Sequence, residues 1–178
     1  CAYYHALLGQ PEKIPAVFRE HQLSSINYLA PGKPMMEMIE NQVYLAQGSY
    51  AKVIGRSEGL LAMCGAMHYA LVALHIRIQT AAAYEMLGKH GEAQALLAQA
   101  LSDAAPDGFL LPFAENYRYL SPLLHQDTTD LAPQIIALGE AAASRLTQTA
   151  RPAALAALTE REYEVVGLMA QRLSNREI

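Results

Sequence analysis

Three neighbouring residues near the end of the chain, Ser174, Asn175 and Arg176, could contact a phosphate. Ser174 opens a Ser-x-x-Glu pattern that ends at Glu177, and such a pattern caps the first turn of a helix. The free N–H groups and the dipole at a helix N-terminus favour an anion. The three residues are therefore candidate phosphate contacts, and contacts of this kind position a protein on a nucleic acid but read no bases. Capping alone would also explain Ser174, and a solvated charge would explain Arg176.

A second capping box, Thr159-x-x-Glu162, lies upstream and predicts the start of another helix. Each cap stabilises its helix by about 1 kcal/mol. Apolar side chains recur at helical spacing between the two boxes: Tyr163, Val166, Leu168, Met169 and Leu173. Two capped helices joined by a short turn are typical of a helical hairpin or of the first half of a helix-turn-helix.

Residues 158–178, LTEREYEVVGLMAQRLSNREI, resemble the opening of a LuxR-type DNA-binding domain. The matching residues are Leu158, Thr159, Arg161, Glu162, Glu164 and Val165, then Leu173, Ser174, Asn175, Arg176, Glu177 and Ile178. The resemblance implies that the helix from Ser174 crosses the DNA backbone, and that the base-reading helix would follow Ile178. It also implies transcription control, with DNA bound through the complete C-terminal domain and not through this chain alone.

The charge of the chain is unevenly distributed. The formal net charge is −4. The four arginines of residues 151–178 are balanced by four glutamates, so the whole negative charge lies in residues 1–150. That part of the chain lacks the basic surface of a nucleic-acid binder and is expected to have another role.

Three glycines recur in similar contexts: Gly9 in HALLGQPEKI, Gly48 in VYLAQGSYAKV and Gly88 in YEMLGKHGEAQA. They are 39 and 40 residues apart, and each separates two helical apolar patterns. A glycine at such a point supplies the left-handed turn between helices. The period indicates a helical solenoid, and the pattern resembles degenerate tetratricopeptide repeats. The third unit matches best, with Ala83, Tyr84, Gly88, Ala93, Leu97 and Ala100.

Abundant alanine and leucine, together with the absence of tryptophan, favour an all-α protein. We expect a tetratricopeptide-like solenoid of antiparallel helix pairs over residues 1–147, a linker over 148–157 and the truncated helix-turn-helix over 158–178. The expected helices lie near residues 1–9, 12–22, 35–47, 50–62, 67–88, 91–104, 110–125, 131–147, 159–171 and from 174 on.

Repeats followed by a LuxR-type start resemble the large MalT-like transcriptional regulators. The segment DGFLLPFAENYRYLSPLL, from Asp107 to Leu124, resembles the part that closes their repeat array. The resemblance implies an ATPase module upstream of the repeats, and a role of the repeats in sensing an inducer and in self-assembly. No Gly-x-x-x-x-Gly-Lys-Ser/Thr loop occurs in this chain, so no cofactor is expected in it.

The first helix of each repeat is expected to line a concave groove. The positions of the three glycines place there the residues Tyr3, Met35, Met38, Gln42, His75, Ile78, Glu85 and Met86. Methionine is common at adaptable binding surfaces. We hypothesise that this groove binds a small-molecule effector or a partner segment. The alternative is that the methionines fill the core and that His75 has no binding role.

The sequence offers no catalytic constellation, and we expect no enzyme. Cys64 and His68 could share a helix face, but a metal site needs more ligands, and no metal is expected. Two cysteines without an export signal are typical of the reducing cytoplasm. No apolar stretch is long and uncharged enough to predict a membrane span.

Two classes of function remain open. One is a sensory and possible oligomerisation segment of a LuxR-family regulator, and the other is a stand-alone tetratricopeptide adaptor that binds a protein or peptide. The motif at residues 158–178 discriminates between them, because an adaptor has no use for the start of a DNA-binding domain.

An electrophoretic shift assay checks the prediction that this chain does not bind DNA by itself. We expect little binding near physiological salt, because the resemblance implies that the base-reading helix would follow Ile178, and residues 1–150 are acidic. Tight binding at that salt concentration would contradict this interpretation.

Overall fold

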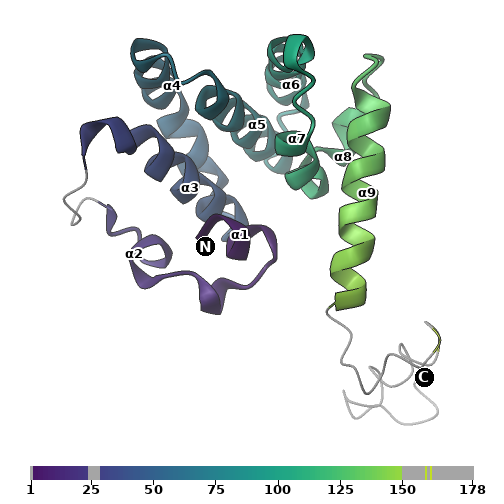
Figure 1. Ribbon diagram of the computed structural model, residues 1–178, viewed down its shortest axis with the longest axis horizontal. Helices are drawn as coiled ribbons and strands as arrows, with labels where there is room; N and C mark the ends of the chain where they lie inside the picture. Colours follow the sequence, from purple (N-terminus) through teal and green to yellow (C-terminus); the bar gives the residue numbers. More distant parts are fainter. Residues whose placement is uncertain (1, 24–28, 150–158, 160, 162–178) are drawn as a thin grey trace. The chain divides into compact units, whose positions relative to one another are not determined.

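The computed structural model describes residues 2–23, 29–149, 159 and 161 (Figure 1). The regular structure in this part of the chain is helical, with no strand among the described residues, so the prediction of an all-α protein is confirmed. Apart from Thr159 and Arg161, the predicted helices after residue 158 lie outside the described residues, as do the candidate DNA contacts Ser174, Asn175 and Arg176. No helix in the described ranges is long and apolar enough to cross a membrane.

The described elements follow one another as helices and short 3-10 turns. They are α1 (Ala2–Leu7), η1 (Pro11–Lys13), α2 (Ala16–Arg19), η3 (Ala30–Gly32), α3 (Lys33–Ala46), α4 (Tyr50–Met67), α5 (Ala70–Met86), α6 (His90–Ala104), η4 (Ala105–Asp107), α7 (Leu111–Glu115), α8 (Tyr117–Leu124) and α9 (Ala132–Thr149).

The three repeat glycines end helices as predicted. Gly9, Gly48 and Gly88 all have positive φ angles, between 63° and 73°. At Gly88 the N–H donates to the carbonyl of Glu85 at 2.9 Å, and the next N–H donates to the carbonyl of Tyr84 at 3.0 Å. The same pair of bonds occurs at the other two glycines, so each helix ends in a Schellman motif.

The repeat has a half-period that the glycines alone do not show. Gly48, His68, Gly88 and Gly108 follow at intervals of 20 residues, and each has a left-handed backbone. His68 ends α4 with the same two bonds, from its own N–H to Gly65 and from the next N–H to Cys64. From Gly48 to Gly108 successive helices therefore end in similar stops, and histidine replaces glycine at one of them.

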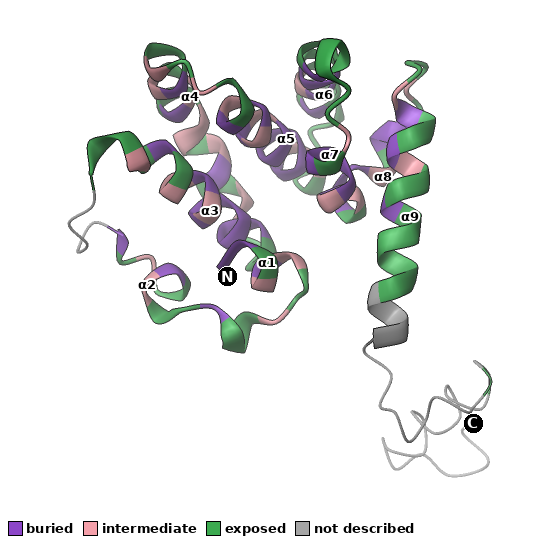
Figure 2. Ribbon diagram, viewed as in Figure 1, coloured by how far each residue is buried: buried purple, intermediate pink, exposed green. Residues whose placement is uncertain are grey.

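Helix α5 is the centre of the fold. It packs against α3, α4, α6, α7 and α8, and Figure 2 shows it buried along most of its length. Ala81, Ala82 and Ala83 are fully buried, and their small side chains let the neighbouring helices approach closely. The main core extends from this helix to Leu97 of α6, Phe113 of α7, Leu120 of α8 and Ile135 of α9.

Two of the predicted helices are wrong. The helix expected over 12–22 is a 3-10 turn followed by the four residues of α2. Pro15 causes the break, because the residue before a proline avoids the helical region, and Ile14 is indeed extended, with φ −70° and ψ 126°.

The helix expected over 110–125 is divided into α7 and α8 at Asn116. Its side-chain amide donates to the carbonyl of Pro112 at 3.0 Å, while its backbone N–H donates to Phe113. A side chain that bonds to the nearby backbone in this way competes with the regular helical pattern.

The chain divides into two compact units, Cys1–Ala142 and Ala143–Ile178. In the first unit α9 packs through Ile135 and Gly139. The ring of Tyr117 occupies the space that a Cβ of Gly139 would need. Helix α9 continues to Thr149, so the first two residues of the expected linker are helical.

The left-handed stop at His68 predicts that replacing it with glycine stabilises the fold. We expect His68→Gly to raise the free energy of unfolding by about 0.5–1 kcal/mol, since a side chain is strained in this conformation. The urea midpoint measures the change. Gly88→Ala is the reciprocal control and should lower it by about 1 kcal/mol, because open space surrounds a Cβ there and only backbone strain acts. Lower stability of His68→Gly would contradict the assignment.

Candidate ligand-binding pocket

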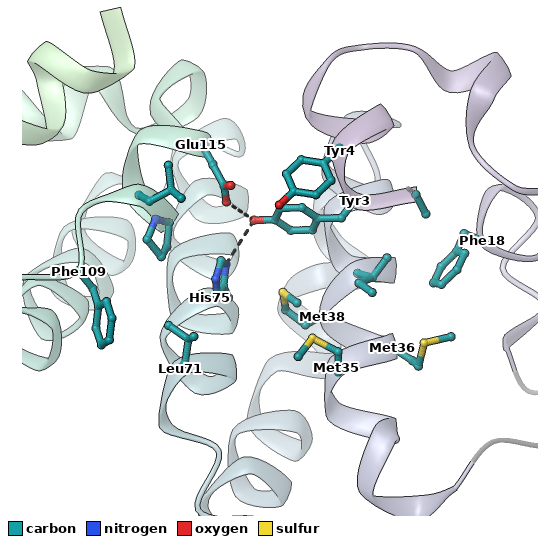
Figure 3. Close-up of a pocket in the computed structure, with 14 residues that line it drawn as sticks. Tyr3, Tyr4, Phe18, Met35, Met36, Met38, Leu71, His75, Phe109 and Glu115 are labelled. Carbon is teal, nitrogen blue, oxygen red and sulfur yellow. Dashed lines mark hydrogen bonds between the residues drawn. The ribbon is translucent and has the colours of Figure 1, made fainter. Parts of the chain in front are cut away.

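A pocket of about 640 Å³ lies within the Cys1–Ala142 unit (Figure 3). Most of its wall comes from α1, α3, α5 and α7, which alternate along the chain with the helices that complete each pair. Its size is in the range of small-molecule sites. The lining residues are Ala2, Tyr3, Tyr4, Phe18, Met35, Met36, Met38, Ile39, Leu71, His75, Phe109, Leu111, Pro112 and Glu115.

Four predicted groove residues come together in this pocket: Tyr3, Met35, Met38 and His75. Figure 3 shows them on both sides of it, with Tyr3 from α1 and the methionines from α3 opposite His75 from α5. Their proximity follows from the repeat, because the first helices of successive pairs share one face.

The other four predicted groove residues lie elsewhere. Gln42 and Ile78 are fully buried, because α7 and α8 cover this part of α3 and α5. Glu85 and Met86 lie at the last turn of α5, outside the pocket. Glu85 pairs there with His90 at 2.8 Å, and the Met86 side chain is 45% exposed. The sequence predicts the helical register correctly but not which helices fold over the groove.

Polar groups in the pocket form a short chain across it. The hydroxyl of Tyr3 donates to Oε2 of Glu115 at 2.8 Å, and it lies 3.3 Å from Nδ1 of His75. Since the only hydrogen of the hydroxyl goes to Glu115, Nδ1 of His75 supplies the hydrogen of the second bond. The chain therefore joins α1 to both α5 and α7, which are 72 and 112 residues away in the sequence.

Burial changes the pKa values of the three side chains that these hydrogen bonds join. It lowers the pKa of His75 to about 4, so the imidazole is neutral at neutral pH. Burial also raises the pKa of Tyr3, and the nearby Glu115 carboxylate raises it further. The pKa of Glu115 is raised by burial, against the opposing effect of the hydrogen bond from Tyr3. Among the described lining residues, only Glu115 can carry a charge at neutral pH.

The sequence did not predict Glu115 as part of the site. A signal was present, because it is the only acidic residue between Asp107 and Leu124 in a largely apolar segment. Apart from Met35, the rim of the pocket was also missed. Several of the most exposed large apolar side chains line it, namely Tyr4 (62%), Met35 (47%), Leu71 (49%), Phe109 (41%) and Leu111 (65%). Exposed apolar groups gathered in one place are typical of a binding site.

A chain of buried amides supports the pocket from within the core. Nε2 of Gln79 donates to Oε1 of Gln42 at 3.0 Å and to the backbone carbonyl of Met38 at 3.1 Å. Nε2 of Gln42 donates to Oδ1 of Asn116 at 3.1 Å. Gln42, Gln79 and Asn116 are fully buried. These bonds hold α3, α5 and the α7–α8 junction together, and thus fix the distance between the pocket walls.

Comparisons with models of protein families, with curated proteins and with solved structures found no match. Among the described residues, no three histidine, cysteine, aspartate or glutamate side chains gather where they could hold a metal ion. The site in this part of the chain is therefore defined by its apolar wall and its single polar chain.

Neighbouring residues of α3 allow a test of the amide chain. Gln42→Leu should lower the free energy of unfolding by about 1–3 kcal/mol, because it removes one of the two bonds from Nε2 of Gln79 and leaves the buried Oδ1 of Asn116 without its donor. Chemical denaturation measures the loss.

Asn41→Leu is the matched control, since Asn41 is equally buried and neither its Nδ2 nor its Oδ1 has a hydrogen-bond partner. This change should leave stability unaltered or increase it. Equal losses in the two variants would show that the amide chain does not hold the walls.

Proposed function

We propose that this chain is the sensory segment of a LuxR-family transcriptional regulator of the MalT-like kind. In this proposal an effector binds in the pocket and changes DNA binding by the complete C-terminal domain. The observation that carries the sensory role is the apolar pocket with a polar chain from the first described helix to α7. The DNA-binding role rests on the resemblance of residues 158–178 to the start of a LuxR-type domain.

The position of the pocket suggests how a ligand could act. Its wall includes α1 and α3 near the start of the repeats, and α7 near their end. A ligand that contacts both sides favours the arrangement in which they are held together. Helix α8 follows α7 directly, and α9 then leads toward the segment that resembles the DNA-binding domain. A typical coupling of about 1–3 kcal/mol would change DNA affinity by roughly 5- to 150-fold.

The proposal includes the remaining expectations from the sequence. The complete regulator would act in the cytoplasm, contain an ATPase module upstream of the repeats and self-assemble through them. The buried thiol of Cys64 is compatible with a reducing compartment.

Two methionines of similar exposure test the pocket. Met35 lines it and is 47% exposed, whereas Met86 lies outside it and is 45% exposed. Met35→Arg should abolish the fluorescence increase of Nile red, a neutral apolar dye, since the arginine places a charge among the apolar side chains of the pocket. Met86→Arg should leave the dye signal unchanged. Equal dye binding by both variants would contradict a ligand site at this pocket.

The regulatory part is tested with the same substitutions in the complete protein. We expect Met35→Arg to remove effector-dependent changes in promoter occupancy and in transcript level, and Met86→Arg to keep them. Dye binding that depends on Met35, combined with no promoter occupancy by the complete protein, would favour the adaptor function instead.

A further inference from the structure

The polar groups of the pocket differ in kind from those of a site for anions. No lysine or arginine occurs among the residues that line it, and its histidine is neutral at neutral pH. A carboxylate or phosphate on a ligand would find no counter-charge there and would meet the Glu115 carboxylate. The pocket therefore disfavours acids.

Glu115 differs from the other partly buried carboxylates of this unit. Arg56 forms ion pairs with both Glu37 and Glu40, and Glu85 contacts His90. Glu115 has no cationic partner among the described residues, and its carboxylate accepts a hydrogen bond from the hydroxyl of Tyr3. A carboxylate removed from water without a counter-ion is costly, and a bound cation would offset this cost.

The rings of Tyr3 and His75 lie at the same end of the pocket as the Glu115 carboxylate. The ring of Tyr3 meets the ring of Tyr4 edge to face at 5.7 Å and the ring of His75 at 5.9 Å. Figure 3 shows the hydroxyl of Tyr3 between the Glu115 carboxylate and the His75 ring, with the ring of Tyr4 beside that of Tyr3. Aromatic faces attract organic ammonium groups. With Nδ1 of His75 donating to Tyr3, Nε2 keeps a lone pair that can accept an N–H.

We infer that the pocket binds an organic amine, with its ammonium group beside Glu115 and its apolar body among the methionines and Leu71. This inference rests on the proposed ligand-binding function and specifies the class of effector. Met35, Met36 and Met38 provide the flexible apolar wall that can adapt to the body of the ligand.

Three probes with the same apolar chain and different head groups test the inference: hexylamine, hexanol and hexanoate. Calorimetric titration of the 178-residue chain at neutral pH should rank them in that order of affinity. We expect hexylamine to bind at least about tenfold more tightly than hexanol, as for one favourable charge interaction in a partly buried site.

Glu115→Gln keeps the shape and an acceptor for Tyr3 but removes the charge. It should weaken hexylamine binding by about tenfold and leave hexanol binding unchanged. Glu85→Gln removes a carboxylate outside the pocket and should change neither affinity.

The outcomes separate the inference from the function on which it rests. Equal binding of the three probes, or tighter binding of hexanoate, would overturn the amine assignment and leave the ligand pocket in place. Absence of binding by all three probes would overturn both. The ranking is measured on the unsubstituted chain, so it holds even if Glu115→Gln does not fold.

Discussion

The described fold depends on one set of interactions, the hydrogen bonds among three buried amides. Gln42 bonds to both Gln79 and Asn116, across α3, α5 and the junction of α7 and α8. Apolar packing alone tolerates small sliding of one helix along another, because it has no direction. Amide hydrogen bonds are directional and therefore fix the register of these helices. The same residues that make the core specific thus set the spacing of the pocket walls above them.

The pocket and the core use polar groups in opposite ways. In the core Gln42, Gln79 and Asn116 each bond to protein groups, and the carboxylates of Glu37 and Glu40 share an arginine. In the pocket Glu115 keeps a charge that the described protein does not neutralise, beside apolar and aromatic side chains. Such incomplete pairing is tolerated where a ligand completes it, and this contrast marks the pocket as a candidate functional site.

Local signals in the sequence predicted the helical repeat well. Gly9, Gly48 and Gly88 marked real helix ends, since a left-handed residue is needed there and glycine adopts it freely. His68 gave no such signal, because its conformation is imposed by the helices on either side. Tyr3, Met35, Met38 and His75 follow from helical register, whereas the burial of Gln42 and Ile78 depends on α7 and α8 folding over them. Long-range closure of this kind leaves no pattern in a short window of sequence.

The bond between Tyr3 and Glu115 has a consequence for how such a chain can evolve. Similar turns end successive helices at intervals of 20 residues from Gly48 to Gly108. A helix pair can therefore be duplicated or lost while the neighbouring helices keep their packing. Inserting one helix pair between α1 and α7 would move Tyr3 and Glu115 apart, and the pocket would no longer form. Growth of the array is therefore compatible with ligand binding only outside this segment. The pocket therefore fixes the number of repeats between α1 and α7.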